Sequence, residues 1–228
     1  MLAFKPFTYD TRLEDARRAV LLALENDPRE YQRIRSCKGS SLRCHSSFCP
    51  SCLRGRAYKD KARILEASRR IAPRRLRFAT FKSRDVVLDD LRKTGRVLLK
   101  SSRKALAKIG VDGYALKLET SYEDRSDERY HPHCHVIVDT PSGGRGFIGS
   151  AAFEDAWLEA LPDYLHPRQS ATDISAVRDL EAASTYLAKS PFGSDWETVD
   201  RTVAAIRATK GLHRLSLRGS LSAHYSVA

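Results

Sequence analysis

The sequence predicts an α+β fold in which helices pack on an antiparallel sheet, with a small zinc-binding segment attached. Three observations favour this fold: the order of helical and strand-like patterns, a cluster of four cysteines, and a short stretch that holds three histidines. The 228 residues are 42% hydrophobic, which is enough to bury a substantial core. We expect two parts, an N-terminal helical and zinc-binding segment over residues 1–72 and a sheet-containing domain over residues 73–228.

Helical and strand-like patterns alternate in the first half of the chain. Apolar residues recur at helical spacing over residues 10–25, and a basic helix is expected over residues 55–71, with a shorter helix between the two. The stretch RLRFATFKS (75–83) alternates in the manner of a strand. Residues 85–109 then carry a second long helical stripe of apolar residues.

Two strand-like stretches joined by a polar segment predict a hairpin. They are GYALKLET (113–120) and the histidine-containing stretch at 131–138. Strands that are not sequential but meet in one sheet, with helices between them, are typical of an α+β sandwich. The chain continues with a helix that contains Phe153 and Trp157, a strand at 172–177 and a helix at 178–189.

The stretch ERYHPHCHVIVD places three histidines at alternating positions. Because side chains of a strand alternate between its faces, His131, His133 and His135 point to one face and the residues between them to the other. On the preceding strand, Glu119 could share the face of the histidines. Neutral imidazole is a common metal ligand, so the pattern predicts a metal site. The alternative is a partly exposed strand whose histidines only form hydrogen bonds.

Four of the five cysteines lie close together, with the spacing C-x6-C-x4-C-x2-C. The CPxC turn aims two thiolates at one point and leaves backbone N–H groups free to bond the sulfurs. Two disulfides are an alternative that a cytosolic setting disfavours, and a redox CxxC would leave two of the cysteines unexplained. We predict a structural zinc ion held by Cys37, Cys44, Cys49 and Cys52, with His45 as a rival to Cys44.

Positive charge is concentrated in one part of the chain. The formal net charge is +12, and residues 53–108 hold 19 Lys and Arg against 5 Asp and Glu. Such a block is typical of a surface that binds a phosphate backbone, and arginine suits phosphate better than lysine does. The alternative is a pair of solvated basic helices. As candidate DNA contacts we take Arg74, Arg75, Arg77 and Lys82.

Targeting signals are not evident. The stretch MLAFKPFTYD has no basic start followed by an apolar run, so we expect no signal peptide. No apolar run approaches the ~18 residues that a membrane span needs. We therefore expect a cytoplasmic protein with no membrane partner.

Several of these motifs together resemble a known superfamily. HPHCHVIV resembles the His-hydrophobe-His motif of the HUH single-strand endonucleases, and YLAK, with Tyr186 and Lys189, resembles their Y-x-x-K nucleophile motif. Y-x-x-K occurs three times here, but only this copy follows the histidines on a predicted helix. In the order of the cysteine cluster, RFATFKS, the histidine motif and STYLAKS, residues 37–191 are similar to the plasmid rolling-circle replication initiators of the Rep class.

The resemblance implies an HUH/Rep-type, RRM-like sandwich that nicks and rejoins single-stranded origin DNA. Tyr186 would attack and form a 5′-phosphotyrosine intermediate, and Lys189 would offset negative charge. Related single-tyrosine initiators carry a glutamate one turn before the nucleophile, where this chain has Ala182. Glu181 is the candidate for that role here, and Asp179 or no carboxylate at all are the alternatives.

A divalent metal ion is expected beside the nucleophile. Two histidines and a carboxylate can hold Mn²⁺ or Mg²⁺ and leave positions open for phosphate, so we assign His133, His135 and Glu119 as ligands. His131 could replace one of them or support a ligand from outside. The implied partners are origin DNA, a host helicase and a polymerase.

Three other functions fit parts of the same pattern. A transposase or a conjugative relaxase of the HUH superfamily would share the chemistry. A non-catalytic, zinc-stabilised DNA-binding module would use the histidines structurally and would not need Tyr186. A metal hydrolase with three histidines that acts on a small molecule fits the basic block poorly.

Overall fold

The structure is a computed structural model that describes residues 11–38, 43–122, 129–141, 148–189, 199–212 and 215–222. Within this part of the chain, seven α-helices and five strands form an α+β fold, which confirms the predicted class. The helices are α1 (Thr11–Ala23), α2 (Pro28–Arg35), α3 (Pro50–Ser68), α4 (Leu88–Ile109), α5 (Ser150–Ala160), α6 (Leu180–Ala188) and α7 (Val199–Ala208), with 3₁₀ turns at Pro73–Arg75 and Asp163–Leu165. The strands are β1 (Leu76–Lys82), β2 (Gly113–Tyr122), β3 (Tyr130–Asp139), β4 (Thr172–Ala176) and β5 (Ser216–Gly219).

The five strands form one antiparallel sheet in the order β4-β1-β3-β2-β5. The hairpin of β2 and β3 pairs as predicted, with Glu119 opposite His133 and Lys117 opposite His135. On the other side of β3, strand β1 sets Thr80 opposite His135. The histidine strand is therefore the centre of the sheet, and its neighbours supply side chains on both sides of the imidazoles.

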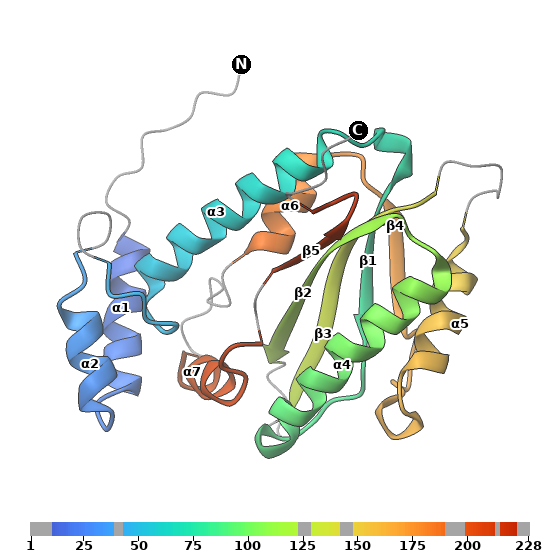
Figure 1. Ribbon diagram of the computed structural model, residues 1–228. Helices are drawn as coiled ribbons and strands as arrows, with labels where there is room; N and C mark the ends of the chain where they lie inside the picture. The colour runs from blue at the N-terminus through green and yellow to red at the C-terminus, as the bar shows by residue number, and fades with distance from the viewer. Residues whose placement is uncertain are drawn as a thin grey trace.

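Both faces of the sheet are covered by helices (Figure 1). On one face, Cys134, Val136 and Val138 of β3 belong to the main core, which also takes in buried residues of α4 and α5 such as Leu98 and Trp157. The other face carries His133, His135 and Ile137 of β3, and α3 and α6 pack against it. The predicted alternation of faces is therefore correct, but the histidine face is partly covered by α6, and His133 and His135 are buried.

A third core surrounds the cysteine segment at one end of the molecule. It combines apolar residues of α1 and α2 with the cysteines and with one face of α7. Helix α7 was not predicted from the sequence, although Val199, Val203 and Ile206 recur at helical spacing and fill this core. In Figure 1, α1, α2 and α7 lie together at this end, beside the start of the long helix α3.

The remaining differences from the predicted elements are at the ends of the helices and strands and in the tail. Helix α6 ends at Ala188, so Lys189 is the residue that caps it and has an extended backbone. Strand β5, which pairs with β2, was not predicted from the polar stretch SLRG. None of the helices in the described part of the chain has the length and apolar composition that a membrane span requires.

Candidate functional site

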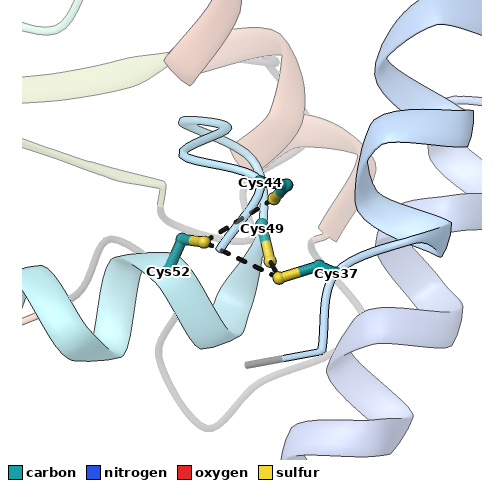
Figure 2. Close-up of side chains that lie close together, drawn as sticks. All are labelled: Cys37, Cys44, Cys49 and Cys52. Carbon is teal, nitrogen blue, oxygen red and sulfur yellow. Dashed lines mark hydrogen bonds between the residues drawn. The ribbon is translucent and has the colours of Figure 1, made fainter. Parts of the chain in front are cut away.

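Four cysteine side chains converge between α2 and the start of α3 (Figure 2). The Sγ of Cys37 lies 3.7 Å from that of Cys49 and 3.8 Å from that of Cys52, and the Sγ atoms of Cys44 and Cys52 are 3.6 Å apart. Four sulfurs at 2.3 Å from a tetrahedral zinc ion would be ~3.8 Å apart, whereas a disulfide needs ~2.05 Å. The cluster therefore has the donors and the spacing of a structural zinc site.

The environment of these thiols disfavours their ionisation in the absence of a cation. Burial raises the pKa of Cys44 to about 11, and burial together with the nearby Cys44 and Cys52 raises the pKa of Cys49. Three buried sulfurs and one half-buried sulfur at this spacing can be thiolates together only if a cation offsets their charge. His45, the rival ligand, is exposed and has a left-handed backbone with φ of 54°, and it lies outside the group that the four cysteines form.

A second group of metal-binding side chains lies on the sheet. Glu119 of β2 and His133 and His135 of β3 place their donor atoms together. The two Nε2 atoms are 3.1 Å apart, and Glu119 Oε2 lies 3.2 Å from His135 Nε2 and 3.9 Å from His133 Nε2. Neighbouring ligands of an octahedral ion, each ~2.1 Å from it, are ~3.0 Å apart. The three donors therefore fit a divalent ion.

Outer partners orient both imidazoles. His133 Nδ1 lies 3.1 Å from the carbonyl oxygen of His131, and His135 Nδ1 lies 3.0 Å from the hydroxyl of Thr80. A Nδ1–H that donates to a carbonyl leaves the lone pair on Nε2, which is the arrangement usual for metal-binding histidines. These contacts turn Nε2 of both rings toward Glu119.

The electrostatics of the group favour a neutral histidine and an ionised carboxylate. Burial, together with the neighbouring His135, lowers the pKa of His133 to about 4. Burial alone would raise the pKa of Glu119, but hydrogen bonds from His135 and Lys189 outweigh it and lower that pKa to about 2. A neutral imidazole and a carboxylate are the protonation states that a metal ligand needs.

Tyr186 of α6 lies over this group. Its ring is in edge-to-face contact with that of His135, with centroids 4.9 Å apart, and it also contacts Phe78 of β1. The ammonium of Lys189 is 4.1 Å from the centre of the Tyr186 ring and 2.7 Å from Glu119 Oε1. The tyrosine is 47% exposed, so a substrate can reach it. Two segments far apart in sequence thus bring a phenol, a cation and the predicted metal ligands together.

A half-buried lysine of β2 holds Lys189 in place. Lys117 donates a hydrogen bond of 2.9 Å to the carbonyl oxygen of Lys189, which fixes the end of α6 on the sheet. Burial lowers the pKa of Lys117, and Asp60 and Glu119 act against this shift. For Lys189, burial would lower the pKa, but its contacts with Glu119 and Tyr186 raise it. Lys189 is therefore held as a cation beside the tyrosine.

The other candidate residues of this site lie around it with partners of their own. His131 Nδ1 is 2.7 Å from Asp85, so its ring lies outside the group formed by the other two histidines. Glu181 is exposed and pairs with Lys61 of α3 at 2.9 Å. Asp179 caps α6 by accepting a hydrogen bond from the backbone of Ala182.

The candidate DNA contacts are divided between the two ends of β1. Arg75 forms ion pairs with Asp112 and Asp139, at 2.5 and 2.7 Å, and Arg77 donates to the carbonyl oxygen of Arg74. Lys82 is on the histidine face, opposite His133 in the strand register, and pairs with Asp173. Of the four, Lys82 is the one that the strand register places beside the metal-binding group.

Sequence reasoning did not identify Thr80, Phe78 or Lys117 as parts of the site. Each comes from a strand next to β3, and only the pairing register shows that they share its face. The alternation in RFATFKS was the available signal. No protein-family model, no curated protein and no solved structure matches the chain, so the site is defined by its chemistry: a His-His-Glu group that could hold a divalent ion beside a tyrosine.

Proposed function

We propose that this protein is a metal-dependent single-strand DNA endonuclease and ligase of the HUH type, with Tyr186 as the nucleophile. The observation that carries the proposal is the position of Tyr186, whose ring contacts His135 while Lys189 lies beside both the tyrosine ring and Glu119. A non-catalytic DNA-binding module would have no use for a half-exposed tyrosine held over buried metal-binding side chains.

The reaction is a transesterification. The Tyr186 oxygen attacks the phosphorus of a phosphodiester, and the bond from phosphorus to the 3′ oxygen breaks. One DNA end leaves with a 3′-OH, and the other stays joined to Tyr186 through its 5′ phosphate. The phenol proton passes to solvent, and the leaving oxygen takes up a proton. The phosphodiester energy is kept in the tyrosine linkage, so the 3′-OH can attack in reverse and rejoin the strand without ATP.

Residues of this chain stabilise the charge that develops on the phenol and hold the tyrosine ring in position. The Lys189 ammonium, held by Glu119 and by the end of α6, stabilises the negative charge that develops on the phenol. His133, His135 and Glu119 would hold a divalent ion such as Mn²⁺ or Mg²⁺, which when bound would polarise the phosphate oxygens. Phe78 and His135 restrict the tyrosine ring from two sides.

We infer that the substrate is origin DNA and that the role is rolling-circle replication initiation. The support is the motif order, with the cysteine cluster ahead of the histidine motif and the Y-x-x-K copy after it, as in the initiators that the sequence resembles. The structural zinc site is the feature that favours an initiator over a transposase or a relaxase.

The test is covalent capture of DNA. Single-stranded oligonucleotides of randomised sequence, labelled at the 3′ end, are incubated with Mn²⁺ and the protein, and the products are separated on a denaturing protein gel. We expect a labelled band of protein size for the wild type and none for Tyr186→Phe. The matched control is Tyr58→Phe, which changes an exposed tyrosine in another Y-x-x-K copy, on α3, and should leave the band intact.

Three outcomes would contradict parts of the proposed function. A band that survives in Tyr186→Phe would place the nucleophile on another residue. A band that does not need added Mn²⁺ would contradict a role for the metal group. Tight, salt-sensitive binding of the pool without any band, also with substrates that contain hairpins, would favour the non-catalytic DNA-binding module.

A further inference from the structure

A cavity of about 630 Å³ opens beside the tyrosine, between the cysteine segment, α3 and the ends of α6 and α7. Its described lining is strongly basic, with six Lys and Arg side chains and two acids. The basic residues are Arg33, Arg56, Arg63, Lys117, Lys189 and Lys210. Because nothing in the proposed cleavage reaction needs so many cations away from the metal group, the cavity requires a separate explanation.

The cavity and the tyrosine site share one residue. Lys189 belongs to both, since its ammonium contacts Glu119 and Tyr186 while the residue lines the cavity wall. Lys117, which binds the carbonyl oxygen of Lys189, also lines the cavity. The cavity therefore adjoins the tyrosine site at Lys189.

The two acids do not neutralise the cavity. Asp60 interacts with Lys117, Arg56 and Arg63, so one carboxylate faces three cations. Glu30 pairs with Arg33 at 3.3 Å and accepts a hydrogen bond from Ser46. Arg56 and Arg63 are exposed and lie on one side of α3, about two turns apart, where a ligand can reach both.

We propose that this cavity binds the phosphate backbone of the single DNA strand that flanks the linkage cleaved by Tyr186. The inference rests on the proposed nuclease function and adds the path of the strand, from the tyrosine along α3 toward the cysteine segment. The volume lies in the ~300–1,000 Å³ range of sites for small ligands, which suits a few units of a single strand. A row of cations without a dominant aromatic platform suits phosphates more than bases.

The basic block 53–108 then consists of two parts, one beside the cavity and one on the opposite face of the sheet. Arg56 and Arg63 of α3 line the cavity, whereas α4 covers the opposite face of the sheet. If the strand follows the cavity, the exposed arginines of α4 make no contact with it. Two of them, Arg96 and Arg103, are a matched control for the two arginines of α3.

The experiment measures binding without cleavage, so it does not depend on the nuclease activity. Fluorescence anisotropy of a labelled single-stranded oligonucleotide pool is recorded over a range of salt concentrations, with every protein carrying Tyr186→Phe. We expect the added Arg56→Gln/Arg63→Gln pair to weaken binding roughly tenfold and to lower the slope of log K against log salt by ~1.4, which is ~0.7 for each lost phosphate contact. Arg96→Gln/Arg103→Gln should change neither quantity. Thermal melting checks that both variants are folded.

Each of the other possible results would contradict either the strand-binding cavity or the proposed nuclease function. Equal losses in the two pairs, or no loss in either, would contradict a strand bound in the cavity. Displacement of the oligonucleotide by micromolar dTMP would show a site for a free nucleotide instead of a strand. If the covalent band is absent from the wild type but the α3 pair alone weakens binding, the proposed nuclease function fails and the strand-binding cavity stands. If the band is present and the α3 pair has no effect, only the cavity assignment fails.

Discussion

At the scale of single residues, His133 shows how the position of a side chain in the sheet changes its chemistry. It is buried between β1 and β2, its Nδ1 bonds the backbone and its Nε2 faces another imidazole. An exposed histidine would be partly protonated near pH 6, whereas this one stays neutral well below that. The burial that keeps His133 neutral, as a metal ligand must be, also makes the stability of the fold sensitive to acid.

The lowered pKa of His133 predicts a pH dependence of stability. The unfolded chain binds a proton near pH 6.5 and the folded chain only near pH 4, so between these values the unfolded state holds more protons. The free energy of unfolding should therefore fall as the pH drops from 6.5 to 4, by roughly 3 kcal/mol from this residue. Urea unfolding without added divalent ions measures it. A His133→Gln variant should lose most of that slope, and an unchanged slope would contradict the assignment.

Thr80 offers a test of the outer partners of the metal group. Thr80→Val keeps the β-branched shape but removes the hydroxyl that contacts His135 Nδ1. We expect Mn²⁺ affinity to fall ~10-fold because the imidazole loses its orienting partner. Electron paramagnetic resonance of free Mn²⁺ gives the affinity. Thr185→Val, which removes an exposed hydroxyl on α6, should leave it unchanged.

At the scale of helices and strands, α6 brings the tyrosine to the sheet. Leu187 and Ala188 bury one side of this short helix in the core on the histidine face, and Tyr186 stays partly exposed next to them. Its ends are fixed by different contacts, the Asp179 cap at the start and the hydrogen bond from Lys117 at the finish. The position of Tyr186, the proposed nucleophile, therefore depends on both ends of one helix of nine residues.

Removing the cap should weaken the helix without touching the ligands. Asp179→Ala should cost ~1 kcal/mol of stability, because the N–H of Ala182 loses its acceptor, and should reduce the yield of the covalent DNA adduct. Mn²⁺ affinity should not change. Asp179→Asn keeps a capping oxygen and should restore both stability and adduct. If the asparagine variant stays impaired, the carboxylate acts in the reaction and not as a cap.

Helices and strands whose own residues show a clear hydrophobic period were predictable from the sequence. Elements that depend on pairing with residues distant in sequence were not. The hairpin and the long helix α4 follow from alternation and from an apolar stripe within their own residues. Strand β5 has four residues and gains its place from pairing with β2, which no local pattern reveals. The alternation placed Glu119 with the histidines, but the roles of Thr80 and Lys117 depend on a register that only the folded sheet defines.

At the scale of the whole molecule, the cysteine segment packs against helices from distant parts of the chain. Its core takes residues from α1 and α2 and is completed by α7, which lies between α6 and β5 in sequence. Helix α3 starts at this cluster and ends against the histidine face of the sheet. The division of the chain at residue 72 stays a prediction, but a zinc ion in this segment would fix the position of the helix that lines the basic cavity.

Loss of zinc should therefore affect the whole protein. Cys52→Ser removes the sulfur that lies 3.6 Å from that of Cys44 and 3.8 Å from that of Cys37. We expect loss of stoichiometric zinc and a fall of more than ~4 kcal/mol in the free energy of unfolding. Elemental analysis and urea unfolding measure the two. Cys134→Ala, in the main core, should cost some stability but keep one zinc per chain. Full zinc retention in Cys52→Ser would contradict a four-cysteine site.

The alternation of side chains along β3 affects what happens to chains that fold with a wrong strand register. The strand carries imidazoles on one face and core residues on the other. A slip of one residue would turn His133 and His135 into the apolar layer under α4 and bring Cys134 and Val136 out beneath α6. Chains with a wrong register would thus lose the ligands and the core in the same step. A chain with a wrong register would therefore be unstable as well as inactive. Chaperones and proteases would recognise such chains by their poor stability.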